Sequence, residues 1–121
     1  MHIHADLTQR VVIHQHEPSW TPSPVPGVER RMLDRVGDEV ARATSIVRYL
    51  PGSQFTRHQH DLDEEILVLE GRFSDERGDY DAGTYIKNPP GSSHAPFTET
   101  GCLLLVKLRH LHPDDTQARR S

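Results

Sequence analysis

Prolines and glycines interrupt this chain so often that long helices are disfavoured. Nine prolines and eight glycines are spread over the 121 residues, and each type tends to end regular structure where it stands. The apolar runs between them are short, as in the EILVL run at 65–69. Short strands separated by turns are typical of a β-sandwich or a β-barrel, so we predict an all-β fold.

Seven segments are predicted to be strands: 10–14, 28–34, 41–50, 55–60, 65–69, 84–87 and 102–109. The fifth is expected to end at Gly71, with a continuation through 72–74 as the alternative. The last is almost continuously apolar, which indicates burial on both faces. Segment 17–27 holds four prolines and Trp20, so we expect an extended, irregular segment that covers a sheet edge or an opening of the core.

The composition argues against several classes of protein. The net charge is −4 and the basic residues form no stripe, so nucleic-acid binding is disfavoured. A single cysteine, Cys102, cannot form an internal disulfide, which fits a reducing compartment. The longest apolar run, 102–106, is too short to span a bilayer, and the N-terminus lacks the features of a signal peptide. We therefore expect a cytoplasmic protein that binds neither nucleic acid nor membrane.

A pair of histidines one residue apart is the main functional signal. His58 and His60 lie in a predicted strand, where residues i and i+2 point to the same face. Glu64 follows four residues later, and His94 comes after a Pro-Pro-Gly turn. Three imidazoles and one carboxylate form a ligand set that suits zinc, iron, nickel, copper or manganese. The spacing therefore predicts a metal site.

Neighbouring carboxylates and histidines compete for this role. Glu64 is preferred to Glu65 because a strand that begins at Glu64 would point Glu64, Ile66 and Val68 inward, and a shift of one residue would reverse the faces. Asp61 and Asp63 are expected in a solvated loop. The remaining histidines are interpreted as exposed side chains: His2, His4, His14, His16, His110 and His112.

Both histidine segments resemble the two sequence motifs of the cupins. The first motif is filled by Gly52, His58, His60, Glu64 and Gly71, and the second by Gly83, Pro89, Gly91 and His94, with Thr98 where the motif has asparagine. The resemblance implies an RmlC-like jelly-roll barrel, that is, a double-stranded β-helix. It also implies that His58, His60, Glu64 and His94 hold one divalent metal ion per chain, which would be zinc, iron, nickel or manganese.

A closer resemblance is to the cupin domain of ChrR-type anti-sigma factors. It is carried by the segments TSIVRYLPGSQF, EEILVLEG and GDYDAGTYIKNPPGSSHAPF, and in that family the metal is zinc. The resemblance implies a single cupin domain over residues 1–121. Residues 1–40 would form N-terminal strands and a proline-rich arm, 41–112 the barrel, and 113–121 a loose tail. Because the sigma-binding helical domain of the regulator has no counterpart in this sequence, we expect no sigma-factor binding.

Two functions remain open at this point. Octahedral iron, nickel or manganese would keep two positions for a small chelating molecule, which indicates a dioxygenase-like enzyme in which Glu64 also moves protons. Tetrahedral zinc would be saturated by four ligands, which indicates a non-catalytic sensor or ligand-binding module related to anti-sigma regulation. In either case we expect a homodimer, since the apolar strand at 102–109 and the arm around Trp20 are hard to bury in one small barrel.

Overall fold

The protein is an all-β structure, as the spacing of prolines and glycines predicts. The computed structural model describes residues 1–55, 58–59 and 63–110, and this part of the chain contains strands but no helix. It therefore holds no helix that could span a membrane. The strands are β1 (His2–Ile3), β2 (Thr21–Pro22), β3 (Val28–Gly37), β4 (Ala41–Tyr49), β5 (His58–Gln59), β6 (Glu64–Asp75), β7 (Gly78–Asp81), β8 (Tyr85–Asn88), β9 (Ser93–His94) and β10 (Cys102–Leu108).

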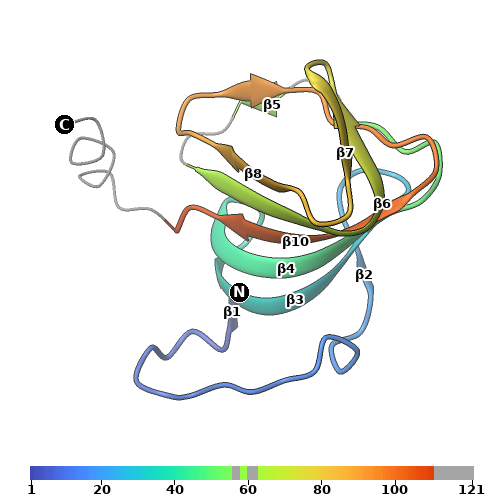
Figure 1. The fold of residues 1–121 in the computed structure, drawn as a ribbon. Helices are drawn as coiled ribbons and strands as arrows, with labels where there is room; N and C mark the ends of the chain where they lie inside the picture. Colours follow the sequence, from blue (N-terminus) through green and yellow to red (C-terminus); the bar gives the residue numbers. More distant parts are fainter. Residues whose placement is uncertain (56–57, 60–62, 111–121) are drawn as a thin grey trace.

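One large antiparallel sheet forms most of the barrel wall. Its strand order is β1-β3-β4-β10-β6-β7, with β2 paired to β3 and β8 paired to β6. A separate pair, β5 and β9, lies across the interior from β3 and β4, so the curved sheet and the small pair enclose a common space (Figure 1). The two histidine segments of the sequence therefore meet in this separate two-stranded sheet.

Side chains that alternate along the strands fill one end of this space. Phe73 and Tyr49 pack edge to face, with ring centroids 5.7 Å apart. On β6 the predicted alternation is present, since Glu64, Ile66 and Val68 are buried. The buried apolar core consists of Val28, Val47, Tyr49, Ile66, Val68, Phe73, Cys102, Leu104 and Val106.

Two predictions about the long strands need correction. On β10, only alternate residues are fully buried; Leu103 and Leu105 are half-buried on the outer face, so burial on both faces was wrong. On β6, the strand does not end at Gly71 but continues to Asp75, which agrees with the alternative. A register shift opposite Leu103–Leu104 bends β6, and Gly71 adopts a φ of +76° just beyond it.

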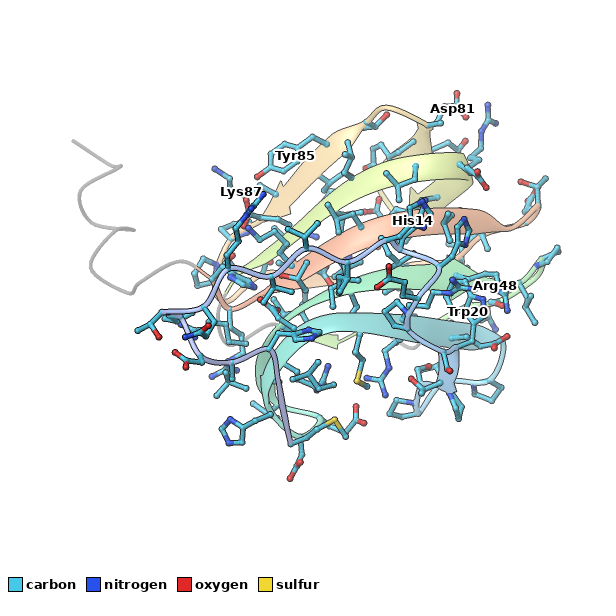
Figure 2. All side chains as sticks on the ribbon, turned by 90° about the horizontal axis from the view of Figure 1, so that it is seen from below. His14, Trp20, Arg48, Asp81, Tyr85 and Lys87 are labelled. Carbon is cyan, nitrogen blue, oxygen red and sulfur yellow. The ribbon has the colours of Figure 1, made fainter. Side chains whose placement is uncertain are left out.

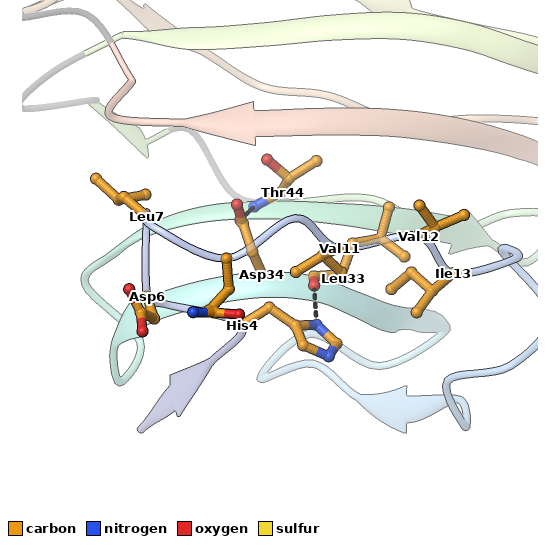
Figure 3. Close-up of a pocket in the computed structure, with 10 residues that line it drawn as sticks. His4, Asp6, Leu7, Val11, Val12, Ile13, Leu33, Asp34 and Thr44 are labelled. Carbon is orange, nitrogen blue, oxygen red and sulfur yellow. Dashed lines mark hydrogen bonds between the residues drawn. The ribbon is translucent and has the colours of Figure 1, made fainter.

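The predicted strand at 10–14 is absent. One edge of β3 pairs with β4; on the other edge β1 pairs with residues 35–36 and β2 with residues 29–30, so β1 and β2 leave residues 31–34 of that edge unpaired. Segment 10–14 instead crosses the outer face of β3 without pairing, and Val12 is 75% exposed (Figures 2 and 3). The segment 17–27 does cover an edge of the sheet, through β2.

Trp20 fastens this arm to the outside of the barrel. The guanidinium carbons of Arg31 and Arg48 lie 4.4 and 4.1 Å from its ring centroid, within the range of cation–π contacts (Figure 2). Arg31 Nη1 also donates a hydrogen bond of 3.0 Å to the carbonyl oxygen of Gln15. Trp20 is therefore a structural anchor of the arm on the face opposite the barrel interior.

Candidate metal centre

Glu64 and His94 meet inside the barrel. The Nε2 atom of His94 lies 3.3 Å from Oε1 of Glu64, and the two residues are 2% and 9% exposed, His94 being the more buried. Two ligand atoms bound to one ion at about 2.0–2.2 Å are separated by roughly 2.8–3.1 Å in octahedral geometry and by roughly 3.3–3.6 Å in tetrahedral geometry. The separation of 3.3 Å therefore fits a shared ion in tetrahedral geometry and lies slightly above the octahedral value.

Strand pairing explains why Glu64 is held at this place. As the first residue of β6, it pairs with Leu108 of β10 on one side and with Asn88 of β8 on the other. The Asn88 side-chain amide Nδ2 donates a hydrogen bond of 3.1 Å to Glu64 Oε1. Asn88 is itself buried, at 7% exposure. It orients the carboxylate by a contact that does not depend on a metal.

Sequence reasoning did not assign a role to Asn88. The signal was present: in the strand Tyr85–Asn88, residues 86 and 88 share a face, and Ile86 is apolar. An asparagine on the apolar face of a strand, directly before a proline turn, indicates a polar group that is needed inside the barrel.

The histidine segment lies beside His94 through its backbone. In the β5–β9 pair, His58 is the register partner of His94, and Gln59 is the partner of Ser93. His60 lies outside the described residues. Among the described side chains, no three from His, Cys, Asp and Glu lie close enough together to hold a metal ion. Of the four predicted ligands, only Glu64 and His94 are among these described side chains. The ligand roles of His58 and His60 stay predictions.

The two competing carboxylates differ in direction. Glu65 lies on the outer face, where its Oε1 accepts a hydrogen bond of 2.8 Å from the Tyr85 hydroxyl. Glu64 faces the interior, as the predicted register requires. Its role as a ligand stays a prediction.

The expectation of a solvated loop was wrong for Asp63, which is 1% exposed, and Asp61 lies outside the described residues. Asp63 directly precedes β6, and its carbonyl oxygen accepts a hydrogen bond of 2.9 Å from the Arg109 amide at the end of β10. This contact holds the residue against the sheet.

Two further ionisable groups in the core remain neutral at physiological pH. Burial, and then the nearby charge of Glu64, raises the pKa of the Tyr49 hydroxyl well above its usual range. Burial raises the pKa of the Cys102 thiol to about 11. Cys102 is therefore a small apolar core residue rather than a thiolate ligand, and Tyr49 contributes a neutral phenol to the interior.

A cavity of about 320 Å³ reaches the Glu64–His94 pair. Its walls are mostly apolar and come from the inner face of the large sheet, with a few polar groups at its ends, among them Arg35, Tyr49 and Glu64. This volume and this mixture are typical of sites for small molecules.

The family described as the ChrR cupin-like domain matches residues 8–112, which is most of the sequence. The chain belongs to this cupin family. The predicted resemblance is confirmed, and the cupin barrel accounts for the curved sheet closed by β5 and β9. Among curated proteins, no sequence matches this cupin.

One similar structure is that of Rhodobacter sphaeroides SigE in complex with the anti-sigma ChrR. The identity is 24%, the TM-score is 0.64, and the match covers 78% of this cupin and 50% of that chain. The cupin thus spans about half the length of that chain. Because this fold occurs in a complex of a sigma factor with its anti-sigma factor, our expectation that excluded a sigma factor as a partner was wrong.

Two other similar structures are matched over most of their own length. An RmlC-like cupin from Shewanella frigidimarina has 18% identity and a TM-score of 0.68, with coverage of 88% of this cupin and 96% of that chain. A putative acetylacetone dioxygenase from Methylibium petroleiphilum has 18% identity and a TM-score of 0.72, with coverage of 88% and 83%. At this identity the likeness establishes the RmlC-like fold.

Proposed function

We propose that this cupin holds one divalent metal ion between His58, His60, Glu64 and His94, and binds a small oxygen-donor molecule in the adjoining cavity. The observation that carries the proposal is the buried contact between Glu64 and His94 at the cavity wall. Placing an ionised carboxylate in a low-dielectric interior costs several kcal/mol unless cations or donors compensate it. A divalent ion shared with imidazoles would compensate this cost.

The residues of the chain would divide the work at this site. A bound metal with two open positions would supply a Lewis acid that polarises an oxygen-donor ligand. Asn88 holds Glu64 in place through Oε1, while the apolar walls of the cavity exclude bulk water. Glu64 is also the proposed group that carries a proton to or from the ligand.

The leading candidate is a metal-dependent, dioxygenase-like enzyme that acts on a small chelating molecule. Support comes from the cavity beside the Glu64–His94 pair and from the shared fold with the putative acetylacetone dioxygenase. The second candidate is a non-catalytic, metal-bound sensor or ligand-binding module related to anti-sigma regulation. It is favoured by the family match and by the SigE–ChrR complex.

The homodimer stays a prediction, for which light scattering is the measurement.

A titration of the cobalt-loaded protein separates the two candidates. We expect a β-diketone or oxalate to change the visible absorption spectrum in a saturable way, because either would occupy two open positions of the metal. Iron-loaded protein with the ligand that binds would then be tested for oxygen uptake. A four-coordinate cobalt spectrum that neither ligand changes would exclude the enzyme and leave the sensor. The Glu65→Gln variant is the control, since this side chain lies on the outer face.

A further inference from the structure

Arg35 is a buried cation that forms no ion pair with any carboxylate among the described residues. It is 2% exposed and lines the same cavity as Glu64 and His94. Its Nε and Nη2 atoms donate to the carbonyl oxygen of Asp38, at 2.8 Å for Nε, and no described carboxylate lies within ion-pairing distance. The neighbouring Arg30, by contrast, is paired with both carboxylate oxygens of Glu39, at 3.2 and 3.3 Å.

A structural role alone does not explain a guanidinium at this position. A neutral donor could fasten the β3–β4 turn through the Asp38 carbonyl oxygen, without the cost of burying a charge. Burial, and then the nearby charge of Arg30, lowers the pKa of Arg35, while the more weakly acting charges of Glu39 and Asp38 raise it. Among the described residues, Nη1 has no hydrogen-bond partner, so one edge of the guanidinium is available to an anion.

Strand register places Arg35 in one row with the candidate metal centre. Across the inner face of the sheet, Arg35 pairs with Ala43, Ala43 with Leu108, and Leu108 with Glu64. Three strand spacings correspond to about 14 Å along the sheet. The curvature of the sheet brings both ends of this row onto the wall of one cavity.

The cavity between these two ends is mostly apolar, although the Arg30–Glu39 ion pair also lines it. Its walls include Val47, Ile66, Leu104, Val106 and Leu108. A ligand that fills the space would therefore have an apolar body, and a charged group on it would be placed most favourably at Arg35. Guanidinium and carboxylate groups match in planar, two-point geometry.

We propose that Arg35 anchors the carboxylate of an organic acid whose apolar body fills the cavity and whose far end faces Glu64 and His94. This inference rests on the proposed function, because it names the ligand class of the same site. It assigns Arg35 a role in selecting acids over neutral molecules.

Matched pairs of acids and amides test this assignment. The probes are 3-phenylpropanoate, hexanoate and benzoate, each compared with its amide, with binding followed by calorimetry and by thermal unfolding. We expect at least one acid to bind and its amide to bind about tenfold more weakly or worse, because the amide lacks the charge. If none of the acids binds at about 10 mM, the weak end of measurable affinities, the proposal is overturned.

Variants of two arginines provide the decisive comparison. Arg35→Gln should remove the preference for the acid, and Arg35→Lys should keep part of it, since lysine retains the charge but not the two-point geometry. Arg72→Gln is the control, because Arg72 is exposed and paired with Asp81 on the outside. An unchanged acid preference in Arg35→Gln would overturn the proposal. If Arg35→Gln fails to fold, Arg35→Lys is the decisive variant, and an unchanged acid preference in that variant would overturn the proposal.

Metal content separates a failure of this inference from a failure of the proposed function. Arg35→Gln should keep the metal content of the unmodified protein, because Arg35 is not among the proposed ligands. Acid selection by Arg35 in a protein that binds no metal would contradict the proposed function and support the inference. Stoichiometric metal without acid selection would support the proposed function and contradict the inference.

Discussion

Replacing Glu64 by glutamine is expected to remove stoichiometric metal, whereas Glu65→Gln should leave metal content near that of the unmodified protein. Glu64 is buried beside His94, and Glu65 lies on the outer face in contact with the Tyr85 hydroxyl. A neutral amide is a weak ligand, and we expect metal affinity to fall by about 100-fold or more, beyond the usual effect of residues that only support ligands. Elemental analysis of the purified variants, prepared in parallel, measures the difference.

The two variants form a matched pair, since they change adjacent residues in the same way. If both variants keep the metal content of the unmodified protein, neither carboxylate is a ligand. Loss in Glu65→Gln alone would mean that β6 has the opposite register in the metal-bound protein, because a shift of one residue exchanges the two faces.

Gly71→Ala is expected to lower the free energy of unfolding by about 3 kcal/mol or more, from left-handed backbone strain together with a steric clash. Gly71 has a φ of +76°, and an added Cβ would collide with the carbonyl oxygen of Gly101 and lie 3.0 Å from Cα of Cys102. Both are backbone groups at the start of β10, so neither moves without disturbing the sheet. Unfolding in urea, followed by circular dichroism, measures the change.

Gly83→Ala is the control for this substitution. Gly83 also has a positive φ, of +95°, but nothing lies within 4 Å of the added Cβ. We expect a loss of only about 1–2 kcal/mol, from the backbone conformation alone. If the two variants lose the same stability, the close approach of β6 to β10 at Gly71 does not explain why glycine stands there.

The strands that alternate strongly were predictable, and so was the direction of Glu64. The β6 strand combines apolar residues on one face with a carboxylate at its start, and both follow from period-two alternation. Segment 10–14 also has strand propensity but remains unpaired, although β1 and β2 cover only the two ends of the free edge of β3. Whether a segment pairs depends on how it packs against strands distant in the sequence, so propensity alone does not reveal it.

The inner face of β3, which forms one wall of the cavity, could not be predicted from the sequence, and Arg35 shows why. Strand β3 carries charged residues at positions 29, 30, 31, 34 and 35, so its inner face cannot be identified by polarity. Alternation from the buried Val28 would point Arg35 outward. A register shift between Met32 and Asp34 moves it to the inner face. A bulge of this kind has no clear signature in a strand so rich in charge.

The most direct test of the account is the metal content of the protein purified without added metal. We expect one divalent ion per chain, and its loss in the His58→Ala/His60→Ala double variant, because these residues complete the ligand set with Glu64 and His94. Circular dichroism would establish that the variant retains its β-structure. Absence of metal from the unmodified protein, or retention of one ion per chain in a folded double variant, would contradict the proposed site.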